Sequence, residues 1–150
     1  MSHPSNSTKP CILSLGYEKR SLEQFVSILK DNHVQLLVDV RRNAISRRQG
    51  YSKKRLEEVL SSNSIGYHHI PELGISRESR RGLSSKADYQ RLFLGYRDSL
   101  SDNTEYLEIL VRLASEIRIA LVCYERDPEF CHRRVLTEVL EDKGFSIVEV

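Results

Sequence analysis

The stretch IALVCY, from Ile119 to Tyr124, is nearly all apolar and decides the fold. A short apolar run of this kind is typical of a strand buried on both faces, as strands are in a parallel sheet. Asp127 and Pro128 follow the run and predict the N-cap and first residue of a helix, and Gly144 predicts its end. The segment therefore predicts a buried strand followed by a helix.

Four more apolar segments have the character of buried strands. They lie at residues 11–15, 34–40, 65–70 and 145–150. Helical patterns separate them: a capping box at Ser21 opens a helix to about Asp31, Ser52 can cap a second helix, and two more follow between Tyr89 and Ala114. No helical or strand period holds between Glu72 and Lys86, which predicts a long loop.

Strands that alternate with helices predict an α/β fold. Parallel strands need crossover connections, and a parallel sheet must be covered on both faces. We therefore predict one α/β domain over residues 11–150, with a mostly parallel five-stranded sheet and helices on both faces in a Rossmann-like, three-layer arrangement. The expected strand order is 3-2-1-4-5.

Size and composition fit a compact domain. A chain of 150 residues with 39% hydrophobic and 29% charged residues has enough apolar material for a core. Residues 1–10 are polar and predict a flexible tail. Because no long apolar segment or secretory signal is present, we expect no membrane span and a cytoplasmic location. Three cysteines are an odd number, so we expect thiols and not a disulfide framework.

Basic residues are concentrated in the segment from Arg41 to Lys86. It holds eleven Lys and Arg but four Asp and Glu, a net charge of +7. The rest of the chain holds twelve basic and seventeen acidic residues, a net −5, although the whole chain carries +2. This asymmetry predicts an anionic partner for the basic segment, with nucleotides and nucleic acids the leading candidates, although an ordinary solvated surface has the same composition.

Polar side chains follow the predicted strands at the edge of the sheet where open α/β folds bind ligands. The candidates are Tyr17 after the first strand, Asp39, Arg41 and Arg42 after the second, Glu72 after the third, and Glu125, Arg126, Cys131, His132 and Arg133 after the fourth. We expect them to form one site.

Chemistry suggests separate roles for these residues. Asp39 and Glu125 could act as acid and base, or could form ion pairs with the neighbouring arginines. Phosphate-binding candidates are Arg41, Arg42, Arg126 and Arg133, with Tyr17, Glu72 and His132 as further ligand contacts. Tyr17, Tyr51 and Tyr67 could stack on a base or belong to the core.

The sequence allows two interpretations of Cys131, a reactive thiolate or an inert core residue. In the first turn of a helix after Asp127, its thiolate would be stabilised by free backbone amides and would be nucleophilic. If it packs against the sheet instead, it is an inert core residue. Cys123 is either a small core residue or a sulfur-transfer residue of the rhodanese kind. Because paired metal-ligand motifs are missing from the sequence, we expect no metal site, and the sequence leaves the cofactor unknown.

Four motifs resemble those of a bacterial and archaeal family, the domain of unknown function 488. They are GYEKRS at residues 16–21, LVDVRR at 37–42, IPELG at 70–74 and CYERDPEFCHRR at 123–134. Tyr51-Ser52 is a mild departure, because the family commonly has a Phe-Ser or similar step there. The resemblance implies a fold and a set of shared polar positions, without an established reaction.

The sequence favours an enzyme that acts on a nucleotide or a nucleic acid, whose phosphate an arginine cluster holds at the carboxyl edge of the sheet. Two alternatives stay open. One is a non-catalytic module that binds nucleotides or nucleic acid, and the other is a cysteine-dependent transfer enzyme acting on a small anion. The oligomeric state is open.

Overall fold

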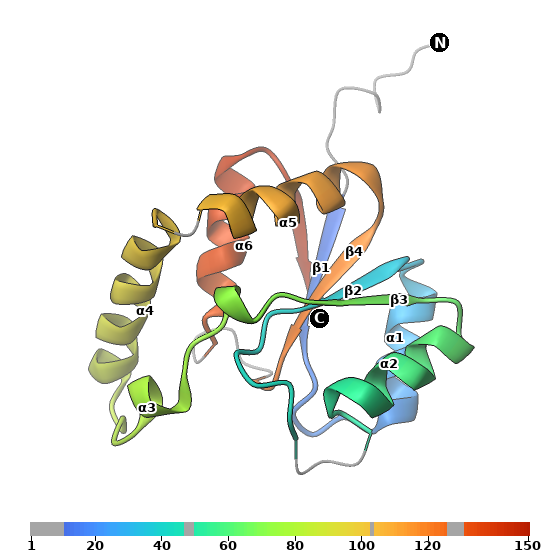
Figure 1. The fold of residues 1–150 in the computed structure, drawn as a ribbon, viewed down its shortest axis with the longest axis horizontal. Helices are drawn as coiled ribbons and strands as arrows, with labels where there is room; N and C mark the ends of the chain where they lie inside the picture. The colour runs from blue at the N-terminus through green and yellow to red at the C-terminus, as the bar shows by residue number, and fades with distance from the viewer. Residues whose placement is uncertain (1–10, 47–49, 103, 126–130) are drawn as a thin grey trace.

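The computed structural model describes residues 11–46, 50–102, 104–125 and 131–150. In these residues the chain forms one α/β domain in which a parallel sheet lies between two groups of helices (Figure 1). The elements are β1 (Cys11–Gly16), α1 (Leu22–Asp31), β2 (Leu36–Asp39), α2 (Lys53–Ser62), β3 (Gly66–His69), the 3-10 helix η2 (Pro71–Leu73), α3 (Arg77–Arg80), α4 (Lys86–Leu100), α5 (Thr104–Glu116), β4 (Ile119–Cys123), α6 (Arg133–Asp142) and β5 (Ser146–Glu149). The predicted fold class and all five strands are confirmed. The predicted tail at residues 1–10 lies outside the described residues.

The five strands are all parallel, in the order β3-β2-β4-β1-β5. The predicted order 3-2-1-4-5 is therefore wrong, because β4 lies between β2 and β1. Every residue of β4 is buried, whereas β3 and β5 at the two edges are partly exposed. An apolar pattern predicts that a strand is buried but does not say which strands lie beside it. The helices between β3 and β4 carry the chain from the edge of the sheet back to its centre.

Alternating side chains of the strands supply two hydrophobic cores. On one face, Leu13 and Leu37 pack with residues of α1 and α2 such as Phe25 and Leu56. On the other face, apolar residues of β1, β2 and β4 pack with α4, α5 and α6. Figure 1 shows α1 and α2 on one side of the sheet and α5 and α6 on the other. In the described part of the chain, no helix combines the length and apolar character that a membrane crossing requires.

Two helix starts show how local sequence signals succeed and fail. The Ser21 hydroxyl accepts from the Gln24 backbone N–H and the Gln24 side chain accepts from the Ser21 N–H, so the predicted capping box is confirmed. Ser52 occupies the N-cap position of α2, but its hydroxyl bonds to the backbone of Ser46 and does not cap the helix. The contact with Ser46 in the preceding loop therefore uses the hydroxyl that was predicted to cap the helix.

The start of α6 differs from the prediction. The expected N-cap, Asp127, lies outside the described residues, and α6 begins at Arg133 with His132 at the N-cap. Cys131 therefore precedes the helix and does not lie in its first turn. This displaces the cysteine from the position on which its predicted reactivity depended.

Candidate ligand-binding site

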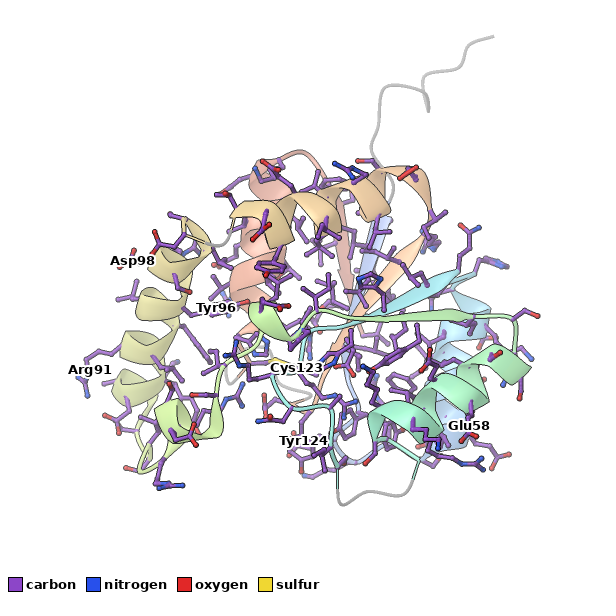
Figure 2. The ribbon with its side chains drawn as sticks, in the orientation of Figure 1. Glu58, Arg91, Tyr96, Asp98, Cys123 and Tyr124 are labelled. Atoms are coloured by element: carbon purple, nitrogen blue, oxygen red, sulfur yellow. A yellow bond between two sulfur atoms is a disulfide. The ribbon has the colours of Figure 1, made fainter. Side chains whose placement is uncertain are left out.

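Three strand ends meet at one edge of the sheet and surround a pocket of about 160 Å³, here called the strand-end pocket. Backbone bonds join its walls: the Tyr17 N–H donates to the Cys123 carbonyl at 3.2 Å, and the Val40 N–H donates to the Val122 carbonyl at 3.2 Å. The pocket is lined by Tyr17, Arg41, Arg42, Asn43, Ile45, Ile75, Arg80, Cys123, Tyr124, Glu125 and His132. Figure 2 labels Cys123 and Tyr124 where β4 ends. Three arginines and one carboxylate give this wall an excess of positive charge.

Asp39 and Arg41 form a buried ion pair behind the pocket. Arg41 Nε lies 2.8 Å from Asp39 Oδ1, and Arg41 Nη2 lies 2.7 Å from Oδ2. Arg41 Nη1 also donates to the Tyr51 carbonyl at 2.6 Å and to the Tyr17 hydroxyl at 3.2 Å, while the Tyr67 hydroxyl donates to Asp39. The pair is held from every side by groups of three other segments.

The protonation of this network follows from its burial and its charges. Burial alone would lower the pKa of Arg41, but the hydrogen bond and charge of Asp39 outweigh it and raise that pKa above its ordinary value. Burial, reinforced by the Asp39 carboxylate, raises the pKa of Tyr67. Asp39 has no exposed surface. It therefore positions Arg41 and does not reach the pocket surface, where the predicted catalytic carboxylate would have to contact a ligand.

The three tyrosines expected to stack on a base have other contacts. Tyr17 and Tyr51 stack on each other with ring centroids 4.2 Å apart, and both are buried. Tyr67 is bonded to Asp39. The sequence reading missed Tyr124, which is 43% exposed and meets the Tyr17 ring edge-on at 5.4 Å. Tyr124 is thus the aromatic ring of the pocket that a ligand can reach.

Arg42 borders two neighbouring hollows, and Glu72 borders one of them. Arg42 is exposed, lines the strand-end pocket, and has a long contact of 3.5 Å to the Pro71 carbonyl. Glu72 lines a separate hollow beside α4 and is not part of the strand-end pocket, contrary to expectation. Gly74 explains the close fit of the two loops, because a Cβ there would lie 2.2 Å from the Arg42 backbone nitrogen.

Arg80 joins the strand-end pocket from α3 and was not singled out in the sequence. Its Nη1 donates to both carboxylate oxygens of Glu125 at 3.2 and 3.3 Å, and its Nη2 lies 3.1 Å from His132 Nδ1. Its buried Nε has no hydrogen-bond partner among the described residues. The signal that pointed to it was the aperiodic basic loop between Glu72 and Lys86, which gave no reason to prefer Arg80 over its neighbours.

His132 is held as a neutral ring. The guanidinium of Arg80 can only donate, so Nδ1 accepts, and Nε2 donates to the Val40 carbonyl at 2.9 Å. Burial, reinforced by the charge of Arg80, lowers the pKa of His132 to about 3. His132 therefore lines the pocket as predicted, but both ring nitrogens are occupied.

Arg133, which the sequence predicted as a phosphate-binding residue, is fully buried and is not among the residues that line the strand-end pocket. Its Nε donates to the Ser14 hydroxyl at 2.7 Å, and its Nη2 pairs with Glu149 at 2.9 Å. Its Nη1 donates to the Glu125 carbonyl at 2.9 Å. Burial lowers the pKa of Arg133, although Glu149 opposes that shift. Arg126, which was also predicted to bind phosphate, lies outside the described residues.

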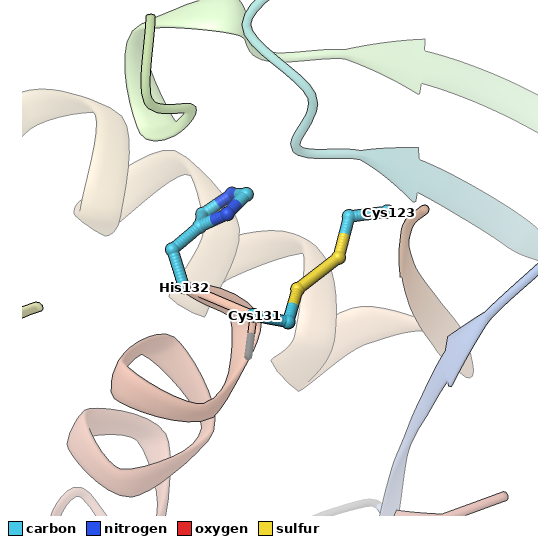
Figure 3. Close-up of side chains that lie close together, drawn as sticks. All are labelled: Cys123, Cys131 and His132. Atoms are coloured by element: carbon cyan, nitrogen blue, oxygen red, sulfur yellow. A yellow bond between two sulfur atoms is a disulfide. The ribbon is translucent and has the colours of Figure 1, made fainter. Parts of the chain in front are cut away.

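Cys123 and Cys131 are joined by a disulfide, so the expectation of three thiols is wrong and Cys11 is the free cysteine (Figure 3). Both sulfur-bearing residues are buried. With His132 they form a group whose potential metal-ligand atoms lie within 4.8 Å of one another. The sulfurs are bonded to each other and face the Arg133 guanidinium, an arrangement that opposes a bound cation.

A sequence profile of the family described as Domain of unknown function DUF488 matches residues 21–140. The chain belongs to this family. No curated protein and no solved structure matches the chain. The DUF488 match includes Arg42, Arg80 and Glu125 and begins after Tyr17. Family membership therefore covers most of the pocket without supplying a reaction, and the function has to be argued from the site.

A larger groove of about 470 Å³ lies elsewhere, between α4 and α6. It is lined by Lys86, Gln90, Phe93, Leu94, Arg97, Arg134, Val135 and Glu138. None of the site residues predicted from the sequence lines this groove. We therefore take the smaller strand-end pocket as the candidate site, since ligands of open α/β sheets bind at the carboxyl ends of the strands.

Proposed function

We propose that the protein is an enzyme that acts on a nucleotide or a nucleic acid bound in the strand-end pocket. The observation that carries this proposal is the combination of three arginines, one carboxylate and an exposed tyrosine ring at the carboxyl edge of a parallel sheet. Guanidinium groups recognise phosphate, and an aromatic face accepts a base. We take the cytoplasm as the location in which this activity operates.

The charges of the pocket favour Arg42 as the phosphate-binding residue. Arg41 is neutralised by Asp39, and Arg80 is paired with Glu125. Arg42 is exposed, and its contact with the Pro71 carbonyl is at the limit of a hydrogen bond. Arg42 would therefore lose little hydrogen bonding within the protein when it binds a phosphate.

Tyr124 and Glu125 divide the remaining work. The exposed Tyr124 ring offers a stacking surface, worth about 1 to 3 kcal/mol per base. Glu125 is the carboxylate that lines the pocket, and it can accept or return a proton during the reaction. Neutral His132 has both nitrogens bonded, so it positions Arg80 and is not a proton carrier.

The basic segment from Arg41 to Lys86 supports a polymeric substrate over a free nucleotide. Its net charge of +7 extends beyond the pocket to α2, where Lys53, Lys54 and Arg55 are exposed. Each phosphate that such residues neutralise adds about 0.9 to the slope of log affinity against log salt for duplex DNA. A mononucleotide held in the pocket would have a much smaller slope.

Binding by single-site variants tests the proposal. A mononucleotide, a single-stranded oligonucleotide and a duplex are titrated against wild type, Arg42→Gln, and two matched controls, Arg55→Gln on the basic segment and Arg112→Gln on α5. We expect Arg42→Gln to weaken all three ligands at least tenfold. Arg55→Gln should weaken only the two polymers and lower their salt slope, by about 0.9 for the duplex, and Arg112→Gln should have no effect. The proposal is wrong if no ligand binds wild type at low salt.

A non-catalytic binding module is the second candidate. The pocket has a volume of about 160 Å³, and this small size favours a module that contacts part of its ligand over an enzyme that encloses a whole nucleotide. Product analysis separates the two. Each ligand that binds is incubated with wild type and examined by mass spectrometry. A new mass that depends on protein concentration supports the enzyme, and unchanged ligand at saturating protein supports the module.

A further inference from the structure

The disulfide lies at the inner wall of the strand-end pocket. Cys123 ends β4, lines the pocket and is 2% exposed, whereas Cys131 precedes α6 and has no exposed surface. Figure 3 shows the two sulfurs bonded beside the His132 side chain. A small thiol that enters the pocket would therefore meet Cys123 and not Cys131.

Arg133 directs positive charge at both sulfurs. Its Nη1 lies 3.1 Å from Cys123 Sγ and 3.7 Å from Cys131 Sγ, and its backbone N–H lies 3.4 Å from Cys131 Sγ. The sulfur of a disulfide is neutral and a weak acceptor, so it is a poor partner for a buried cation. A thiolate in the same place would be a strong partner.

The guanidinium is held in this position from the opposite side. Ser14 of β1 and Glu149 of β5 bind Nε and Nη2, so the group cannot turn away from the sulfurs when they are reduced. Among the residues that the structure describes, the charged and titratable groups of this region are Arg133 and His132 at the start of α6, Glu125 after β4, Glu149 on β5, Arg80 on α3 and Asp39 on β2. Within this described set, Arg133 is the residue whose donors contact the sulfurs.

We propose that Cys123 and Cys131 are a reversible thiol–disulfide exchange pair that reacts through the strand-end pocket with a thiol or dithiol reductant. The proposal does not depend on the nucleotide activity. Stabilising the reduced form of such a pair makes its disulfide easier to reduce. The buried guanidinium supplies that stabilisation, because it interacts better with a thiolate than with a disulfide.

The exchange proceeds in two displacements. The thiolate of the reductant attacks Cys123 Sγ, the Cys123–Cys131 bond breaks, and Cys131 leaves as a thiolate next to the Arg133 N–H. A second thiolate of the reductant then attacks the reductant's own sulfur in the mixed disulfide, and Cys123 leaves as a thiolate next to Arg133 Nη1. Two electrons pass to the protein, and the reductant leaves as its disulfide.

A redox titration of the folded protein tests the proposal. The protein is equilibrated without denaturant in mixtures of reduced and oxidised dithiothreitol and quenched with acid. The trapped thiols are then alkylated in denaturant at neutral pH and identified by mass spectrometry. We expect Cys123 and Cys131 to gain and lose label together, while Cys11 stays labelled throughout as the internal reference. Native circular dichroism at each point shows that the reduced protein is folded.

Two variants change the charge at the sulfurs in opposite directions. Arg133→Gln removes the cation, so the disulfide should become roughly tenfold harder to reduce, about 30 mV for two electrons. Glu149→Gln removes the charge that neutralises the cation but keeps an oxygen that can accept from Nη2, while the Ser14 hydroxyl and the Glu125 carbonyl still accept from the guanidinium. This variant should therefore fold and be easier to reduce. The thiolate pKa, followed by ultraviolet absorbance of the reduced protein, should rise in the first variant and fall in the second.

Three results would overturn the proposal. The first is a disulfide that is reduced only when the protein unfolds, and the second is a folded protein whose two thiols stay free in oxidised dithiothreitol. The third is stoichiometric zinc in the purified protein that blocks alkylation of both cysteines, as measured by elemental analysis. Failure of Arg133→Gln to fold leaves Glu149→Gln as the deciding variant, and an unchanged midpoint there contradicts the role of the guanidinium.

Discussion

Two ion pairs stand at the same edge of the sheet, and they differ in what surrounds them. Asp39 and Arg41 have side chains that are 0% and 7% exposed, and the hydroxyls of Tyr17 and Tyr67 and the carbonyl of Tyr51 bond to them. Glu125 and Arg80 have side chains that are 19% and 27% exposed, and one guanidinium nitrogen has no partner among the described residues. Both carboxylates lie at the end of a strand, Asp39 as the last residue of β2 and Glu125 two residues after β4. The first pair is nevertheless closed to solvent, whereas the second is open to a ligand.

The difference is one of burial and not of residue type. A buried pair is costly to form and its members are strongly coupled, because removing one leaves an uncompensated charge in the interior. A partly exposed pair in water contributes little to stability and can exchange its partner for a ligand. Four predictions test this contrast, in order of their expected effect on stability.

Breaking the buried pair should have the largest effect. Asp39→Asn leaves the Arg41 guanidinium buried without its carboxylate, so the free energy of unfolding should fall by about 3 to 5 kcal/mol. Urea denaturation measures the change. Glu58→Gln is the matched control, since Glu58 is 59% exposed and its pair with Arg55 spans 4.0 Å. Equal effects of the two variants would show that the buried pair is not a support.

Acid should destabilise the protein through His132. Its pKa is lowered to about 3 in the folded state, mainly by burial and then by Arg80, so between about pH 6.5 and pH 3 only the unfolded chain binds this proton. Its contribution to stability is complete above the unfolded pKa and is lost as the pH falls toward the folded one, by up to about 1.4 kcal/mol per pH unit.

Urea denaturation at about pH 7 and about pH 5 measures that loss. His132→Gln should lose less stability over this range than wild type, and His68→Gln, at an exposed position on β3, should match wild type. If His132→Gln and wild type have the same pH dependence, His132 is not buried as a neutral ring.

Trimming the buried network should have a smaller effect than breaking it. Tyr67→Phe removes the hydroxyl that donates to Asp39 and leaves the ion pair intact. Because a hydrogen bond to a charged group is lost, the free energy of unfolding should fall by about 1 to 2 kcal/mol. Tyr124→Phe, at an exposed ring, is the control and should be close to neutral. A loss as large as that of Asp39→Asn would mean that Tyr67 and Arg41 contribute equally to holding the carboxylate.

Much of the fold could be predicted because apolar periodicity reports burial. All five strands and the Ser21 cap depended on local patterns that the structure keeps. The strand order could not be predicted, because the position of β4 between β2 and β1 depends on contacts between segments far apart in sequence. The same limit hid the disulfide, since an odd number of cysteines says nothing about which two sulfurs the fold brings together.

The candidate site was predicted in outline but not in its roles. Placing polar residues at strand ends identified Tyr17, Arg42, Glu125 and His132 as residues that line one pocket. Sequence alone could not separate Arg42 from Arg133, which carries the same charge but is fully buried. Arg133 is buried because Ser14 and Glu149 bond to its guanidinium. Ser14 lies 119 residues away in the chain and Glu149 lies 16 residues away, so a local pattern does not reveal either contact.

Opening the accessible pair should have the smallest effect on stability and a distinct effect on binding. Glu125→Gln removes a partly exposed carboxylate, so the free energy of unfolding should change by less than about 1 kcal/mol. Arg80 then loses its counter-charge, and the pocket becomes more positive. Affinity for an anionic ligand should therefore rise, while any turnover of that ligand should be lost, because Glu125 is the carboxylate proposed to move the proton.

Urea denaturation, titration with the mononucleotide and product analysis measure the three quantities on one preparation, and Glu58→Gln again serves as the control. A large loss of stability would make the Arg80–Glu125 pair a support like the Asp39–Arg41 pair, and turnover at the wild-type rate would remove Glu125 from the chemistry.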